Sequence, residues 1–229
     1  MNQDATSHAW RVLPLEREVA YLHKHELMRN FTLTRSQHTL DELWPLEHQP
    51  VFTQGLGGKA EHVLNSGSIP VVRTERGGQV TYHGPGQLVV YILADLRRRS
   101  LKVKELVFAI EEALIETLAH WGLRGLRRPN APGVYLQQVP GSDAQEFCKI
   151  AALGLKVNQG CSWHGVALNV DMDLDPYLRI NPCGYQGLRT IDMATLGLKV
   201  SLDTVTQRLT RALCDHIDRV SALDRPLIR

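Results

Sequence analysis

Short β-rich segments fill the middle of this chain and limit the folds that it can adopt. Each is bounded by Gly, Pro, Asn or Asp, the residues that end strands and form turns. Only two of the connections between them carry long helical patterns, so the sequence does not predict a parallel sheet with a helix after every strand. It predicts an α+β fold, with one mixed sheet flanked by helices. The expected strands are VFTQG, IPVVRTE, QLVVYILADL, GVYLQQV, KIAALGLKV and HGVALNVDM.

Three other segments have features of helices. The clearest is VKELVFAIEEALIETLAHWG, residues 103–122, which Gly122 is placed to end. Another helix is expected to start after Ser201, and one more over residues 14–30, where Pro14 suits a first helical turn. The expected inward faces are Val103, Leu106, Val107, Ile110, Leu114, Leu118 and Trp121; Leu202, Val205, Leu209, Leu213 and His216; and Leu15, Val19, Leu22 and Leu27.

Length, charge and cysteine content restrict the class of protein. The 229 residues, 43% of them hydrophobic, suit one globular domain over residues 1–229, which we expect to be a monomer. A formal net charge of +2 offers no basic field for phosphates, so no nucleic-acid partner is expected. The N-terminus has no apolar signal segment, and the longest apolar run is too short to span a bilayer, so we expect a cytoplasmic protein with no membrane partner. Its four cysteines are expected to be free thiols.

The segment RGGQVTYHGPGQLVVY, residues 76–91, places four glycines and a proline ahead of an apolar strand. A plain turn needs only one or two residues with positive φ, so this density indicates that a ligand approaches the backbone closely. Two phosphate-binding motifs are excluded. Gly58 and Lys59 are followed by Ala60 instead of the Ser or Thr of a P-loop, and Gly84 and Gly86 precede a strand instead of the helix of a dinucleotide site.

Two reactive side chains lie in other glycine-bearing segments. Cys183 stands between Pro182 and Gly184, on a stiff and unhindered loop that suits a nucleophile, although free structural cysteines are common. Lys149 leads the apolar segment IAALGL. Such a lysine is either the solvated end of a strand or a base whose pKa is depressed toward neutrality beside that apolar strand. The residues alone leave both interpretations open.

Five motifs, in this order along the chain, resemble those of the lipoyl(octanoyl) transferases: RGGQVTYHGPGQ, APGVY, KIAALGLK, HGVALNV and INPCG. The likeness runs from Leu40 to Gly187. It implies the fold of the biotin and lipoate protein ligases and an acyltransferase without a cofactor. It also implies the substrates: the octanoyl group would come from octanoyl-acyl carrier protein and pass to a lysine on the lipoyl domains of 2-oxoacid dehydrogenase complexes and on the glycine cleavage H protein.

The resemblance also implies a catalytic dyad. The cysteine of INPCG is Cys183 and the lysine that opens KIAALG is Lys149. Cys148 precedes this lysine, but its side chain should point to the opposite face of the strand, which argues against it as the nucleophile. His164 and His83 either orient the acyl group or satisfy backbone partners. The substrate-binding residues that the family implies are Arg76, Gly77, Gly78, Gln79, Val80, Thr81, Tyr82, His83, Ala152, Leu153, Gly154, Gly165, Val166 and Ala167.

The expected reaction passes through a thioester on Cys183. A free thiol with a pKa near 8.5 is only about 3% thiolate at pH 7, so Lys149 must help, either as a neutral base or as an ammonium that stabilises the thiolate. The Gly-Pro-Gly turn is expected to direct Tyr82 and His83 toward the thioester. Backbone N–H groups of the glycine-rich segment, or near Gly184, would stabilise the oxyanion.

Two alternatives differ in their chemistry. A lipoate–protein ligase of the same fold would form an acyl-adenylate, need ATP and Mg²⁺, and not require Cys183. A zinc-stabilised binding module would use Cys161, His164 and Cys183, but it lacks the fourth ligand and the second close pair that are usual in a structural site. We therefore expect no metal.

Overall fold

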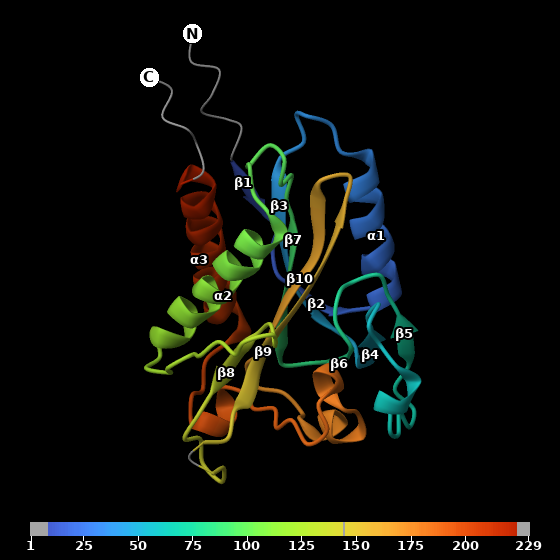
Figure 1. Cartoon of the computed structure of the whole chain (residues 1–229), viewed down its shortest axis with the longest axis vertical. Coiled ribbons are helices and arrows are strands. Elements are labelled where there is room, and N and C mark those ends of the chain that lie inside the picture. Colours follow the sequence, from blue (N-terminus) through green and yellow to red (C-terminus); the bar gives the residue numbers. More distant parts are fainter. Residues whose placement is uncertain (1–8, 144, 224–229) are drawn as a thin grey trace.

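A mixed sheet with helices on both faces forms the main body of the protein, and a smaller sheet lies at one end of it (Figure 1). The computed structural model describes residues 9–143 and 145–223. The expected α+β class is confirmed. The strands are β1 (Trp10–Val12), β2 (Glu16–Val19), β3 (Asp41–His48), β4 (Val51–Gln54), β5 (Val71–Arg73), β6 (Val80–His83), β7 (Gln87–Leu93), β8 (Val134–Leu136), β9 (Cys148–Asn158) and β10 (Cys161–Asn169); the helices are α1 (Tyr21–Thr34), α2 (Val103–Ala119) and α3 (Leu202–Leu223).

The prediction of one sheet is wrong, because the strands form two. The larger has the order β1-β3-β7-β10-β9-β8, with β2 also paired to β3, and the smaller has the order β5-β4-β6. Neither β3 nor β6 was predicted. The sequence of β3, DELWPLEH, contains a proline and three acidic residues, and β6 lies inside the glycine-rich segment. Both patterns are unusual for strands, and tertiary pairing overrides them.

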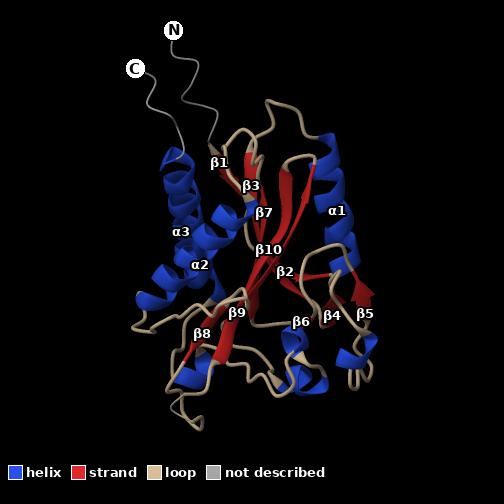
Figure 2. Ribbon diagram, viewed as in Figure 1, coloured by secondary structure: helices blue, strands red, loops and turns tan. Residues whose placement is uncertain are grey.

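The central strand β7 is buried on both faces, and its side chains alternate between two cores. Leu88, Val90 and Ile92 belong to the core under α2 and α3. Val89 and Tyr91 belong to a second core, to which Met28 of α1 also contributes. This is the period-two alternation of a strand. Figure 2 shows the sheet between these helices, with α2 and α3 on one side and α1 on the other.

The predicted helices α2 and α3 are confirmed, although α2 ends at Ala119, before Gly122, and Val103 of its expected inward face is 45% exposed. The N-terminal helix starts later than predicted. Its first residue is Tyr21, because the preceding residues form β2, which pairs with β3. The inward face also differs. Leu22 and Leu27 are 64% and 41% exposed, and the buried residues of the helix are Tyr21, Lys24, Met28 and Thr32.

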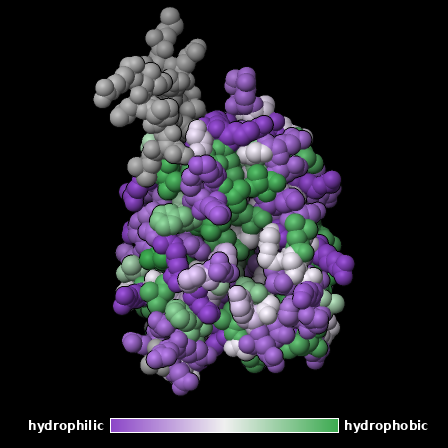
Figure 3. Space-filling model, in the orientation of Figure 1, coloured by the Kyte–Doolittle hydropathy of each residue, from purple (hydrophilic) through white to green (hydrophobic). Residues whose placement is uncertain are grey.

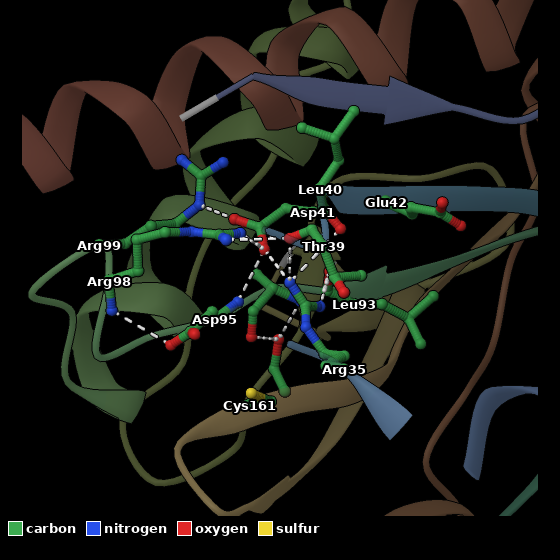
Figure 4. A network of polar contacts seen from close by, with 12 residues as sticks. Arg35, Thr39, Leu40, Asp41, Glu42, Leu93, Asp95, Arg98, Arg99 and Cys161 are labelled. Atoms are coloured by element: carbon green, nitrogen blue, oxygen red, sulfur yellow. Dashed lines mark hydrogen bonds and ion pairs between the residues drawn. The ribbon is translucent and has the colours of Figure 1, made fainter. Parts of the chain in front are cut away.

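A buried ionic network joins the end of α1 to the sheet and to α3 (Figure 4). Asp41, at the start of β3, is fully buried and accepts hydrogen bonds from Arg35, Arg98 and Arg99. Arg99 also donates to Asp218 of α3 at 2.5 Å. A carboxylate at this depth is stable only with such partners, so the network ties three parts of the fold together.

Hydrophilic side chains surround hydrophobic ones that gather toward the middle of the face drawn in Figure 3. Among the described residues, no helix combines the length and the apolar character needed to cross a bilayer.

Candidate active site

Cys183 lies on a short 3₁₀ turn, Pro182–Gly184, that presents its thiol to a cavity. The backbone of Cys183 has φ 57° and ψ 16°, in the left-handed region that non-glycine residues rarely adopt. Such a conformation costs on the order of 1–3 kcal/mol and persists only where the surroundings hold it. Here the N–H of Gly184 donates to the carbonyl of Asn181 at 2.9 Å, and that of Tyr185 donates to Pro182 at 3.1 Å.

The segment after Cys183 pairs with the start of β9 and so brings the thiol to Lys149. The N–H of Lys149 donates to the carbonyl of Arg189 at 2.8 Å, and the N–H of Ile191 donates to the carbonyl of Lys149 at 3.0 Å. The Nζ of Lys149 then donates to the Sγ of Cys183 at 3.0 Å and to the carbonyl oxygen of Pro132 at 2.9 Å. Lys149 is 5% exposed, so its interpretation as a solvated strand end is wrong.

Gly133, in the APGVY motif, makes room for the lysine. A Cβ at this position would lie 2.7 Å from the Cε of Lys149 and 2.5 Å from the carbonyl oxygen of Ala151. The residue also has φ +129°, which disfavours any side chain. Its N–H donates to the carboxylate of Glu111 on α2 at 2.9 Å. Glycine is therefore required at this position if Lys149 is to reach Cys183.

The charge state of Lys149 follows from its surroundings. Burial alone would lower its pKa, but attraction to the thiolate form of Cys183 and to the Tyr135 hydroxyl outweighs burial, and the pKa of Lys149 is raised. The Nζ also lies 5.1 Å from the centre of the Tyr135 ring, within cation–π range. The raised pKa favours the ammonium form of Lys149 over a neutral amine.

A cavity with an empty volume of about 520 Å³, part of it open to solvent, extends from Cys183 over the sheet. Of the predicted substrate-binding residues, only Gly77 and Tyr82 do not line it. The predicted residues that do are Arg76, Gly78, Gln79, Val80, Thr81, His83, Ala152, Leu153, Gly154, Gly165, Val166 and Ala167, together with His164.

Two paired glycines form part of the cavity wall, Gly165 of β10 and Gly154 of β9. A Cβ on Gly165 would lie 2.0 Å from the carbonyl oxygen of Val90, so no side chain fits there. A Cβ on Gly154 would lie 3.0 Å from the carbonyl oxygen of Gly77 and 3.2 Å from the Cδ of Arg76. Gly154 therefore lets the segment that starts at Arg76 lie directly on the sheet, whereas Gly165 lets the backbones of β10 and β7 approach closely.

Arg76 holds the glycine-rich segment to the small sheet. Its guanidinium donates to the carbonyl oxygens of Thr53 at 2.6 Å, Gln79 at 2.9 Å and Gly77 at 2.9 Å. Burial lowers its pKa from the usual arginine value. The bonds to Gly77 and Gln79 curl the segment around the guanidinium, which fixes the wall of the cavity next to the thiol.

Tyr82 does not face the thioester position that the sequence predicted for it. In β6 its side chain points opposite to those of Thr81 and His83, and it packs with Phe52 and Tyr177. His83 does line the cavity. Its ring nitrogens bond the side chains of Thr53 at 3.2 Å and Gln87 at 2.7 Å, instead of backbone partners. Burial lowers the pKa of His83 to about 3, so the ring is neutral.

His164 is the other histidine of the cavity. It lies in β10 with φ +61° and is 2% exposed. Its Nε2 is buried and has no hydrogen-bond partner among the described residues. Burial lowers its pKa well below the usual value, so this ring is also neutral.

A smaller cavity adjoins the thiol, and the polar side chains of Lys149, Asn169 and Tyr177 form part of its lining. The Tyr177 hydroxyl accepts a hydrogen bond from Gln87 at 2.9 Å and donates to the carbonyl of Tyr82 at 3.1 Å. The backbone donors expected for an oxyanion are not available at three of the named glycines. The N–H of Gly184 bonds Asn181, that of Gly77 bonds Leu155 at 2.9 Å, and that of Gly86 bonds the carboxylate of Glu47 at 2.9 Å.

Sequence reasoning missed three residues of the cavity wall, Tyr21, Val89 and Tyr91. Tyr21 begins α1, a part of the chain outside the motifs. Val89 and Tyr91 follow the glycine-rich segment directly, and the alternation of β7 could have identified them as neighbours on one face.

Cys161, His164 and Cys183 do not come together as the zinc site that the sequence spacing argued against. Among the described residues, the one group of side chains close enough to share a metal ion is His25, Glu75 and His164, and it includes neither Cys161 nor Cys183. Cys148 is fully buried in the core under α2 and α3, on the opposite side of β9 from Lys149, as predicted.

The sequence of this chain matches known proteins over most of its length. Residues 20–214 match the family model described as the lipoyl protein ligase A/B catalytic domain. An octanoyltransferase of Paraburkholderia phymatum is 54% identical over 199 residues, covering 86% of this chain and 78% of the relative. An octanoyltransferase of Albidiferax ferrireducens is 52% identical over 216 residues, covering 87% and 94% of the two chains.

Solved structures share the fold at much lower identity. A lipoate protein ligase from Thermoplasma acidophilum has a TM-score of 0.64 and 17% identity, covering 90% of this chain and 84% of that one. The biotin protein ligase of Aquifex aeolicus has a TM-score of 0.52 and 10% identity, covering 93% and 70%. At these identities the similarity shows the fold alone.

Proposed function

The chain belongs to the octanoyltransferases, acyltransferases that share the lipoyl protein ligase A/B catalytic domain, and we propose that it works through a thioester on Cys183 with Lys149 as its acid and base. The donor is octanoyl-acyl carrier protein. The acceptors are the lysines of lipoyl domains of 2-oxoacid dehydrogenase complexes and of the glycine cleavage H protein. The reaction is the first step of endogenous protein lipoylation and needs no ATP.

The contact between Lys149 and Cys183 carries the proposal. The 3.0 Å hydrogen bond from Nζ to Sγ joins the two groups where the larger cavity meets the smaller one. Aliphatic side chains such as Leu153 and Val166 line the larger cavity and suit an acyl chain. In the smaller cavity the side chains of Lys149 and Asn169 offer hydrogen-bond donors beside Cys183 for a developing oxyanion. Cysteine thiolates are good nucleophiles, and their thioesters remain reactive toward amines.

In the first half-reaction the thiolate of Cys183 attacks the carbonyl carbon of the donor thioester. A new S–C bond forms, and the bond between that carbon and the carrier sulfur breaks. The departing thiolate takes a proton from the ammonium of Lys149 and leaves as a thiol, which leaves Lys149 neutral. Lys149 lies within hydrogen-bond distance of Cys183, and its raised pKa favours the protonated form that can give up this proton.

In the second half-reaction the acceptor lysine gives one proton to neutral Lys149 and attacks the carbonyl carbon of the acyl-enzyme. The amide bond forms, the bond to Sγ of Cys183 breaks, and the amide nitrogen loses its second proton to solvent. The ammonium of Lys149 and the thiolate of Cys183 are thus restored. Dividing one difficult transfer into two easier ones is the advantage of a covalent intermediate.

The test is transfer from octanoyl-acyl carrier protein to an isolated lipoyl domain, measured without ATP by the mass of the lipoyl domain. The parent protein is expected to add one octanoyl group, and Cys183→Ala to add none. Cys214→Ala, which changes a thiol on α3, is the matched control and should retain transfer. Transfer by the parent only when ATP is present would contradict the proposal and favour an adenylate-forming ligase.

A further inference from the structure

Three potential metal ligands meet beside the acyl cavity, from parts of the chain that no sequence spacing connects. They are His25 of α1, Glu75 after β5 and His164 of β10. One ring nitrogen of each histidine and a carboxylate oxygen of Glu75 lie within 4.8 Å of one another. His164 lines the acyl cavity, but none of the three takes part in a proton transfer or bond change of the proposed reaction.

Two of the ligand atoms already lie close together. The Nε2 of His25 and an Oε of Glu75 are 2.8 Å apart, joined by a hydrogen bond. Zinc–nitrogen and zinc–oxygen bonds of about 2.0–2.2 Å in a tetrahedral site separate neighbouring ligand atoms by about 3.3 Å. The 2.8 Å contact is somewhat shorter than that spacing, and all the ligand atoms of the group lie within 4.8 Å of one another. Small rotations of the partly exposed side chains of His25 and Glu75 would bring the distances between ligand atoms to that value.

His164 provides an independent sign of a missing partner. Its side chain is almost fully buried, its Nε2 makes no hydrogen bond to the described residues, and its backbone takes a left-handed conformation within a strand. A buried polar atom without a partner is costly, and strain of this kind is concentrated at functional sites. The ring is also fixed, since it stacks on Trp163 with ring centres 4.5 Å apart.

Solvent can reach the group at Glu75. A polar cavity with an empty volume of about 660 Å³, part of it open solvent, is lined by Glu75 and Trp163 among others. Arg29 and Lys156 also line it and would disfavour a cation there by charge alone. Binding of a metal ion would therefore depend on direct bonds to the three ligands, because the surrounding charges do not attract a cation.

From these observations we propose that His25, Glu75 and His164 bind a transition-metal ion of the zinc class, with two imidazoles, one carboxylate and a remaining position for water. Two imidazoles with one carboxylate are a ligand set that zinc accepts with an open fourth position. One ligand, His164, lines the same cavity as Cys183. The ligand set includes neither Cys183 nor Lys149, so the proposal does not depend on the transferase mechanism.

The test uses the full chain with Cys183→Ala, so that the reactive thiol cannot bind the metal, after treatment with EDTA. Isothermal titration with Zn²⁺ should give one equivalent bound. His25→Ala and Glu75→Gln should each weaken the affinity at least about tenfold, since even outer-shell changes at zinc sites cost 10–100-fold. His23→Ala, on the exposed face of the same helix, is the matched control and should bind as the parent does.

A second measurement needs no change at the ligands. On addition of Zn²⁺, the NMR signals of the His25 and His164 rings should shift, and those of the exposed His38 should not. Absence of zinc binding would overturn the proposal. So would full affinity in both His25→Ala and Glu75→Gln, or ring shifts confined to other histidines.

Discussion

The Nζ of Lys149 lies 3.0 Å from the Sγ of Cys183, although 34 positions separate the two residues in the sequence. Backbone pairing of Lys149 with Arg189 and Ile191 produces this contact, and Gly133 leaves the space for it. The proposed chemistry depends on this relationship, and the predictions below address its parts.

Replacing the lysine should disable the thiol without unfolding the protein. Lys149→Met removes the ammonium that stabilises the thiolate and serves as the acid and base, so kcat/KM for octanoyl transfer should fall by about 10²–10⁴-fold. Alkylation of Cys183 by iodoacetamide at pH 7 should slow as well. Lys104→Met, at an exposed position of α2, is the control. Unchanged alkylation in Lys149→Met would argue against a thiolate–ammonium pair.

Gly133→Ala should displace the lysine. Its Cβ would lie 2.7 Å from the Cε of Lys149, so transfer activity should fall by at least about tenfold, the scale of one misplaced catalytic group. Gly122→Ala is the control for backbone strain. Gly122 also has positive φ, but a Cβ there would meet no atom within 4 Å, so this variant adds strain without crowding. It should lose about 1–2 kcal/mol of stability and keep its activity. Equal activity losses in the two variants would show that crowding at Lys149 is unimportant.

Val89 should control the length of acyl chain that the cavity accepts. Val89 lines the cavity, whereas its neighbour Val90 points into the core under the helices. Val89→Phe should lower kcat/KM for an octanoyl donor relative to a butanoyl donor by about 10–200-fold, the range known for a methylene-sized change in an apolar pocket. Val90→Ala should destabilise the protein but leave the ratio unchanged. The same ratio in Val89→Phe and the parent would exclude Val89 from the acyl site.

Buried histidines should make the protein less stable in mild acid. Burial lowers the pKa of His48 to about 4 and that of His83 to about 3. In the unfolded chain both titrate near about 6.5, so between about pH 6.5 and pH 4 the unfolded state binds more protons and stability falls as pH falls. Each histidine should remove about 2 kcal/mol between pH 7 and pH 5.

The measurement is the free energy of unfolding in urea at both pH values. His48→Gln should reduce the difference between pH 7 and pH 5, while His38→Gln, at an exposed position, should not. An unchanged pH dependence in His48→Gln would show that His48 does not contribute.

The sequence predicted an element correctly where its local residue pattern agrees with the partners that it meets in the fold. It failed where pairing with a distant strand decides the structure. The predictions of helices α2 and α3 were correct because the apolar residues of both segments repeat at helical spacing over many turns. The start of α1 was wrong because Glu16–Val19 pairs with a strand far away in the sequence. Likewise, β3 contains Pro45 and three acidic residues, and only pairing with neighbouring strands makes it a strand.

The sequence predicted the site residues that lie in short motifs. Resemblance to a known family picked out Cys183 and Lys149, and the structure brings them together. The same motifs could not reveal that Tyr21 reaches the cavity from α1, or that the side chain of Tyr82 points away from it. Nor could any spacing connect His25 and Glu75 with His164, since three separate elements carry them.

The most direct test of the proposed mechanism is the intact mass of the protein after mixing with octanoyl-acyl carrier protein in the absence of ATP. The parent protein is predicted to gain one octanoyl group that neutral hydroxylamine removes, and Cys183→Ala is predicted to gain none. An adduct that forms equally on Cys183→Ala, or only when ATP is supplied, would contradict a thioester on Cys183.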